Sequence, residues 1–322
     1  MSPKTTSATE PAGGPPRRLQ AQSKRYGERA IQGSLAFCAV ISVLTTTAIV
    51  VSLLIPTLEF FDTVTVREFL TGTDWSPQFE PAEFGVLPIV VGTLSVAFWG
   101  MLFAIPMGLG AAVFLSEYAS PRVRRTVKPV LEVLAGIPTV AIGIFAVSFI
   151  LPEVIVPLWP GEFLGGATGK PFMALAAGLG IGLMIVPIIA SLSDDAMRAV
   201  PRGLHEGAYA LGATKAKVAT RVIFPAALSG IVASIVLAIS RAVGETMIVV
   251  LAAGSNPNLT FNPVESIQAM TSYIATTATG DVATGTNDYK SIFAVGALLF
   301  VMTLIMNLIS IRLVRRYREV YE

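Results

Sequence analysis

Six long stretches of the chain consist almost entirely of apolar residues, and they restrict the possible fold more than any other feature. A helix that crosses a bilayer needs about 20 mostly apolar residues, because the hydrocarbon core is about 30 Å thick and a helix rises about 1.5 Å per residue. The stretches that meet this length predict spanning helices at residues 31–58, 86–115, 129–151, 171–193, 223–253 and 291–311. Charged residues make up only 14% of the 322 residues, against roughly 25% in soluble domains. The sequence therefore predicts an all-α, multi-pass membrane protein.

The polar segments between the spans predict its orientation. Six spans place both termini on one side of the membrane. Segments on that side hold 19 of the 23 Lys and Arg residues, in 1–33, 116–128, 194–222 and 312–322. Cytoplasmic segments are enriched in Lys and Arg, so both termini are expected in the cytoplasm. Residues 1–30, rich in Pro, Gly, Ser and Thr, are expected to form a disordered tail, and residues 312–322 a basic tail that follows a permease-like domain over 31–311.

Several classes of function are excluded by composition. A net charge of +2 provides no general basic field for nucleic acid. The single histidine, His205, excludes His-rich metal sites. The run 165–170 resembles a phosphate-binding loop but lacks the first glycine, and Pro171 replaces the Ser or Thr that follows the lysine. We therefore expect no catalytic site, no metal and no cofactor in this chain.

One element outside the membrane is predicted in the last outer loop. Asn262 is a suitable helix cap, Pro263 suits the first helical position, and apolar residues recur at helical spacing from Val264 to Ile274. This pattern predicts a short amphipathic helix on the outer face.

The cytoplasmic segment 194–222 has a helix–turn–helix pattern. Gly212 can adopt the left-handed conformation that ends a helix, and Thr214 can cap the next one. Glu206 is followed by Gly207 and Ala208, whose small side chains leave one helix face open to close approach by another protein. The pattern alone is also typical of an amphipathic connector lying on the membrane surface.

The fifth span contains two charged residues at membrane depth, Arg241 and Glu245. Such residues are costly there and indicate a functional site. Four positions apart on one helix, they are expected to share a face and to pair. A guanidinium can also bind two phosphate oxygens through its planar fork. A purely structural salt bridge between helices is the alternative.

Both segments resemble those of a known family. The loop is similar to the EAA loop of ABC importer permeases, with matches at Glu206, Ala208, Gly212 and Pro225 and a departure at Gly207. The run from Arg241 through Glu245 and Thr246 to Met247 resembles the signature of phosphate-specific transport (Pst) permeases, and Met247 favours the C-type subunit. The resemblance extends from about residue 30 to the C-terminus. It includes the segment around Pro138, where Thr139 replaces the usual serine.

The resemblance implies a type I (MetI-like) importer permease of a prokaryotic cytoplasmic membrane. It implies a pathway for phosphate that includes Arg241, Glu245, Thr246 and Thr139, and docking of an ATPase at Glu206, Gly207, Ala208 and Gly212. The expected partners are an A-type permease, two copies of an ATP-binding subunit and an extracytoplasmic phosphate-binding protein. The chain itself is then a transport subunit and not an enzyme.

Other functions remain open on the residues. A permease for sulfate, molybdate or phosphonate would share the loop. An ion-coupled secondary transporter would need no ATPase, although the sequence has no evident inverted repeat. An intramembrane enzyme has little support, because no pair of buried acids accompanies His205.

Overall fold

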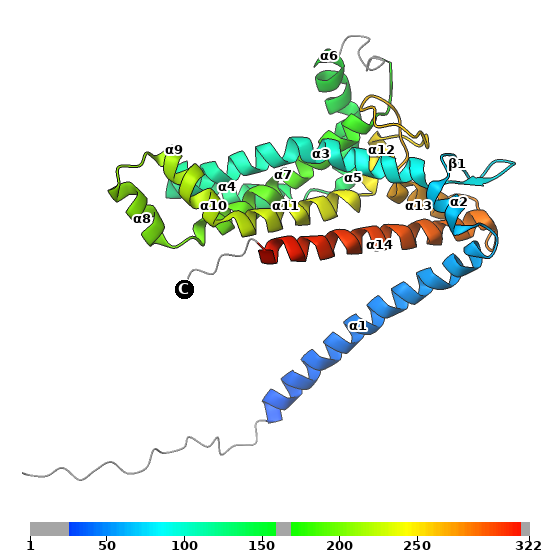
Figure 1. The fold of residues 1–322 in the computed structure, drawn as a ribbon, viewed down its shortest axis with the longest axis horizontal. Coiled ribbons are helices and arrows are strands. Elements are labelled where there is room, and N and C mark those ends of the chain that lie inside the picture. The colour runs from blue at the N-terminus through cyan, green and yellow to red at the C-terminus, as the bar shows by residue number, and fades with distance from the viewer. Residues whose placement is uncertain (1–25, 159–168, 317–322) are drawn as a thin grey trace, which may run out of the picture. The chain divides into compact units, whose positions relative to one another are not determined.

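The computed structural model describes residues 26–158 and 169–316 (Figure 1). The chain divides into two units, residues 1–51 and 52–322. The first unit contains the greater part of one helix, α1 (Tyr26–Phe61), whose side chains up to residue 49 are exposed where they are described. Residues 26–30 of the expected tail belong to α1, and residues 1–25 lie outside the described part of the chain.

Five helical segments are long and apolar enough to cross a membrane. They are Ala30–Phe61, Leu87–Tyr118, Thr139–Leu158, Ala174–Arg198 and Asn287–Arg312. A sixth candidate is a pair of helical segments, Lys215–Ala226 and Leu228–Val243, which meet at an angle of 72°. The described residues thus contain five single candidates and one bent pair where the sequence predicts six spans.

The third span differs from its prediction at residues 129–151. Helix α4 (Pro121–Leu134) is a separate helix without a buried residue. The chain then breaks at Gly136–Pro138 before α5 (Thr139–Phe145), the π-helical η2 (Ala146–Ile155) and α6 (Val156–Leu158). Proline has no backbone N–H to continue a helix, and the charged residues of α4 oppose its burial in an apolar layer. The span therefore begins ten residues later than predicted.

The fifth span, predicted as continuous over 223–253, is interrupted twice. Segment α10 (Phe224–Ala226) ends in a bend at Ala227, and α11 (Leu228–Val243) follows. A second break precedes α12 (Met247–Ala252). At that break the hydroxyl of Thr271 donates to the carbonyl oxygen of Glu245 over 2.8 Å. This side-chain bond satisfies a buried backbone group that an uninterrupted helix would satisfy itself.

The centre of the second unit is the pair α3 (Leu87–Val113) and α7 (Ala174–Arg198), which lie side by side (Figure 1). Their backbones approach closely at glycines. A Cβ atom on Gly100 would lie 2.8 Å from the carbonyl oxygen of Gly178. Small residues at such crossings let membrane helices pack through backbone contact, so the sequence of this interface determines how near the two spans lie.

One end of the second unit carries small extramembrane elements. They are α2 (Val66–Thr71), the strand pair β1 (Trp75–Ser76) and β2 (Glu83–Phe84), and α13 (Met270–Thr279). Edge-to-face aromatic contacts join Phe60, Phe69, Trp75, Phe84 and Tyr273. The Tyr273 hydroxyl lies 2.6 Å from that of Ser291 on α14 (Asn287–Arg316). Burial raises the pKa of the Tyr273 phenol above its ordinary value.

The helix predicted from Asn262 to Ile274 is wrong in position. Residues 263–265 form a turn, residues 266–269 have no regular structure, and α13 begins only at Met270, where the Ser272 hydroxyl accepts from the backbone N–H of Ala269. Asn262 instead caps a turn, with its side-chain oxygen accepting from the N–H of Val264. Backbone bonds from Ala174 to Glu265 and from Leu175 to Pro263 hold this segment against the start of α7. Tertiary hydrogen bonds therefore override a local helical pattern.

The opposite end of the second unit carries α4, α8 (Arg202–Ala210) and α9 (Lys215–Val218), as Figure 1 shows. The C-terminal part of α14 also points toward this end. That helix includes residues 312–316 of the expected basic tail, and residues 317–322 lie outside the described chain.

Candidate functional site: a broken span and a docking loop

The two charged residues of the fifth span are separated by the break in the helix. Arg241 belongs to the last turn of α11, whereas Glu245 follows its end at Val243. Among the residues that the structure describes, no ion pair joins Arg241 to Glu245, so the predicted pairing is wrong. The rule that residues four apart share a face applies only within a continuous helix.

Each of the two side chains has a different environment. Arg241 is exposed in the single chain, and its Nη2 atom lies 3.7 Å from the Sδ atom of Met184 on α7. Glu245 is 8% exposed, and its Oε1 atom accepts from the N–H of Ile248 over 3.5 Å. Glu245 thus caps the first turn of α12, while the guanidinium of Arg241 remains accessible to an anion.

The two threonines of the predicted pathway stand at the starts of neighbouring helices. Thr246 precedes α12 and Thr139 is the first residue of α5. These helices pack closely, because a Cβ atom on Gly143 of α5 would lie 2.8 Å from Cδ1 of Leu251 and 3.3 Å from Cα of Ile248. No hydrogen bond in the described chain links Thr139 to Arg241, Glu245 or Thr246. The structure brings their helices together without joining their side chains.

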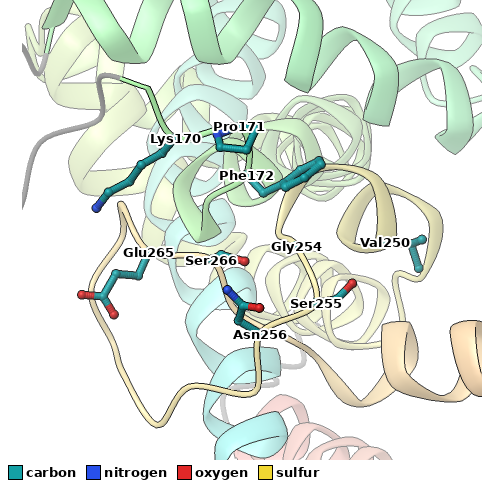
Figure 2. Close-up of a pocket in the computed structure, with 9 residues that line it drawn as sticks. All are labelled: Lys170, Pro171, Phe172, Val250, Gly254, Ser255, Asn256, Glu265 and Ser266. Atoms are coloured by element: carbon teal, nitrogen blue, oxygen red, sulfur yellow. The ribbon is translucent and has the colours of Figure 1, made fainter.

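A cavity of about 460 Å³ opens near the other end of α12 (Figure 2). Its lining comes from three segments: residues 170–172, Val250, and the loop residues 254–256 with 265 and 266. Lys170 has no ion pair within the described part of the chain, and the carboxylate of Glu265 accepts from Asn262 Nδ2 over 3.0 Å. Sequence reasoning missed this cavity, although Lys170 is one of only three basic residues in the predicted outer loops.

The cavity depends on a close backbone approach at Gly254. This residue has a φ of +96°, and a Cβ atom there would lie 2.0 Å from the Oγ atom of Ser266. Only glycine adopts such a conformation without strain and leaves room for the serine. The loop 254–266 is therefore folded onto the start of α7 by a glycine that the sequence pattern did not single out.

The loop with the EAA-like pattern forms the predicted helix, glycine stop and second helix. Gly212 has a φ of +76°, which confirms its predicted left-handed conformation, and its N–H donates to the carbonyl oxygen of Tyr209. Thr214 occupies the cap position of α9 but makes no capping bond through its side chain. Glu206 and Gly207 are exposed, and Ala208 is half-buried.

The sequence analysis did not single out Leu211, whose side chain is 89% exposed at the tip of this turn. Together with Glu206, Gly207 and Tyr209 it forms a face of the loop that the described chain leaves uncovered.

A cluster of charges at the same end of the unit was also missed. The buried carboxylate of Asp194, on the last turns of α7, lies 2.7 Å from Nη2 of Arg124 and 3.7 Å from Nζ of Lys128, both on α4. Lys128 also pairs with Asp195. The sequence signal that could have predicted this cluster is the spacing of Arg124 and Lys128, four apart on one amphipathic helix, together with the adjacent acids Asp194 and Asp195 at the end of a span. These contacts hold α4 against α7.

Comparisons with known proteins agree with this arrangement. Residues 104–319 match the family described as binding-protein-dependent transport system inner membrane component. The phosphate transport system permease protein PstC of Pasteurella multocida is 32% identical over 319 residues, covering 94% of this chain and 98% of that protein. The probable ABC transporter permease protein YqgH of Bacillus subtilis is 32% identical over 274 residues, covering 84% and 86%.

Solved structures share the fold at lower identity. A chain of a bacterial alginate ABC transporter, in complex with a pentasaccharide-bound periplasmic protein, has a TM-score of 0.59 at 17% identity and covers 91% of this chain and 98% of that one. A chain of the inward-facing MetNI methionine ABC transporter has a TM-score of 0.52 at 20% identity, covering 73% and 95%. The predicted MetI-like importer fold is thereby confirmed. The chain belongs to the family of binding-protein-dependent transport system inner membrane components, as a PstC-type permease subunit of an ABC importer rather than an enzyme.

Proposed function

We propose that this chain is the C-type permease subunit of an ATP-driven importer of inorganic phosphate. The observation that carries the proposal is the accessible guanidinium of Arg241 at a break in an apolar span, in a chain whose relatives include PstC phosphate permeases. A dehydrated phosphate is prohibitively costly in an apolar interior unless a fixed cation meets it. Of the chain's Lys and Arg residues, Arg241 is the one predicted deep within a span.

In this proposal, two helix breaks contribute to the translocation pathway. The break between α11 and α12 contributes Arg241 and Thr246, and the break before α5 contributes Thr139. Arg241 binds the phosphate, and the hydroxyls of Thr246 and Thr139 donate to its oxygens. Glu245 holds the break in shape by capping the first turn of α12. Six spans with one deep cation line only part of a pathway, so the pathway needs an A-type permease as its second half.

The other proposed partners follow from the two ends of the molecule. Two copies of an ATP-binding subunit serve the complex, one docking on this chain at Glu206, Gly207, Ala208 and Gly212. An extracytoplasmic phosphate-binding protein delivers the substrate at the end that carries α2, β1 and α13. This assignment places both termini in the cytoplasm, which is supported by the concentration of Lys and Arg in the segments on that side.

A permease for another oxyanion, such as sulfate, molybdate or phosphonate, is the second candidate. The docking loop is common to both, and a guanidinium alone binds any of these anions. The PstC relatives favour phosphate. An ion-coupled secondary transporter is disfavoured by the membership of the importer family.

Uptake of labelled phosphate into vesicles holding the full complex tests the proposal. Arg241→Gln is expected to abolish uptake while assembly and ATP binding persist, because no cation then meets the anion. Arg122→Gln removes an exposed guanidinium from α4 and serves as the matched control with near-normal uptake. Normal phosphate uptake by a well-inserted Arg241→Gln variant contradicts the role of Arg241. Uptake of sulfate in preference to phosphate by the unaltered complex contradicts the substrate.

A further inference from the structure

Both helices of the docking loop contact the same short segment at the end of α3. This segment, the π-helical η1 (Phe114–Tyr118), continues α3 toward the end of the unit that carries the loop. Glu117 of η1 faces His205 of α8, with Oε1 3.5 Å from Nε2. The next residue, Tyr118, lies under the Nζ atom of Lys215 on α9, 5.6 Å from the ring centroid. The two helices on either side of Gly212 are thus attached to consecutive residues.

The Glu117 carboxylate is well placed to hold the imidazole. Its side chain is only 6% exposed, and the hydroxyl of Ser116 donates to the same Oε1 atom over 2.9 Å. The His205 side chain is 24% exposed, and its buried Nδ1 atom has no hydrogen-bond partner in the described chain. Within the described part of the chain, the contact with Glu117 is therefore the polar contact of the His205 imidazole. A low local dielectric strengthens such a contact.

Helix α8 depends on few other attachments. It has no fully buried residue, and its half-buried Leu204 and Ala208 are the members that pack against the apolar cluster around Val218 and Ile223. Elements with little buried apolar surface move most easily relative to the rest of a protein. Removal of one polar attachment should therefore free α8 from α3 without unfolding the bundle.

We propose that Glu117 and His205 form a joint through which movement of the docking loop is passed to the spans. The inference rests on the proposed function, in which an ATPase moves α8. The joint connects α8 to α3, α3 packs on α7 through the Gly100–Gly178 approach, and Met184 of α7 contacts Arg241. A contiguous series of contacts thus runs from the loop to the proposed phosphate ligand. Glu117 and His205 are positioning residues and touch no substrate.

The first test measures phosphate transported per ATP hydrolysed by the full complex in vesicles, after the membrane level of each variant is checked. Glu117→Ala and His205→Ala are each expected to lower this ratio about 2- to 30-fold, the range of measured coupling changes. The double variant should lose no more than the worse single one, because both substitutions remove the same contact. Glu117→Gln retains a hydrogen-bonding side chain and should restore part of the ratio. Arg122→Ala, on the exposed face of α4, is the control.

A second test does not require phosphate to be the substrate. With Cys38 replaced by Ala, spin labels at Arg202→Cys on α8 and Phe114→Cys on η1 report the distance between the two segments in the full complex. We expect this distance to stay constant on ATP binding in the otherwise unaltered chain and to change when Glu117→Ala is added.

The outcomes separate the joint from the proposed function. Unchanged ratios in both alanine variants, additive losses in the double variant, or a label distance that changes equally with and without Glu117 would overturn the joint. Absence of phosphate uptake by the unaltered complex contradicts the proposed function, and the label distances then still decide whether the joint exists.

Discussion

Thr271 donates its hydroxyl hydrogen to the backbone carbonyl of Glu245 over 2.8 Å, across 26 positions of sequence. Both residues are buried, and the bond lies at the break between α11 and α12. A residue of the outer helix α13 therefore stabilises the break that separates Arg241 from Glu245.

Thr271→Val should destabilise the protein by about 1–3 kcal/mol, because it leaves a buried carbonyl without its donor. The measurement is thermal unfolding of the detergent-solubilised protein. Thr303→Val is the matched control, since the Thr303 hydroxyl bonds only to carbonyls of its own helix, α14. Equal destabilisation by the two variants would contradict the role of Thr271 in the break.

The Arg124→Ala variant should cost about 3 kcal/mol, because it leaves the fully buried carboxylate of Asp194 with only the more distant Lys128. Adding Asp194→Asn should recover part of this loss by removing the buried charge. Asp195→Asn is the control, and since the Asp195 side chain is 56% exposed its effect should stay below about 1 kcal/mol. Chemical denaturation in detergent measures all three, and a small effect of Arg124→Ala would show that α4 is held by other contacts.

Two glycines with positive φ should respond differently to alanine. Gly212→Ala adds a Cβ atom into open space and should cost about 1–2 kcal/mol from backbone strain alone. Gly254→Ala carries the same strain and also forces a Cβ against Ser266 Oγ, so about 1–3 kcal/mol more is expected. Thermal unfolding compares the two. Ser266→Gly should relieve the added cost in the Gly254→Ala background, and its failure to do so would contradict the clash.

Gly212→Val should leave the protein inserted but uncouple ATP hydrolysis from phosphate uptake. A β-branched residue strongly disfavours the left-handed conformation, so α8 and α9 lose their mutual angle and the docking surface changes. The control is Gly203→Val, on α8, where φ is ordinary and no atom lies within 4 Å of the added Cβ. Normal uptake per ATP hydrolysed by Gly212→Val would reject the proposed docking role of the turn.

Local patterns were sufficient for much of the architecture. The lengths of the apolar stretches predicted which parts of the chain form spanning helices, since a segment without charges has few stable alternatives to a buried helix. The left-handed turn at Gly212 was also predictable, because the preference of glycine for positive φ acts within one residue. The motifs around Glu206 and Arg241 indicated the permease family that the comparisons confirmed.

Only the tertiary structure decided the features that depend on partners far apart in the chain. The break at Glu245 requires the Thr271 hydroxyl, and the non-helical segment 262–269 requires the backbone of α7. The contact between Glu117 and His205 joins residues 88 positions apart. Helical periodicity is a local preference of modest energy, whereas a buried carbonyl or carboxylate without a partner costs several times more. Where the two conflict, the chain gives up local regularity to satisfy the buried group, and sequence patterns alone do not record that choice.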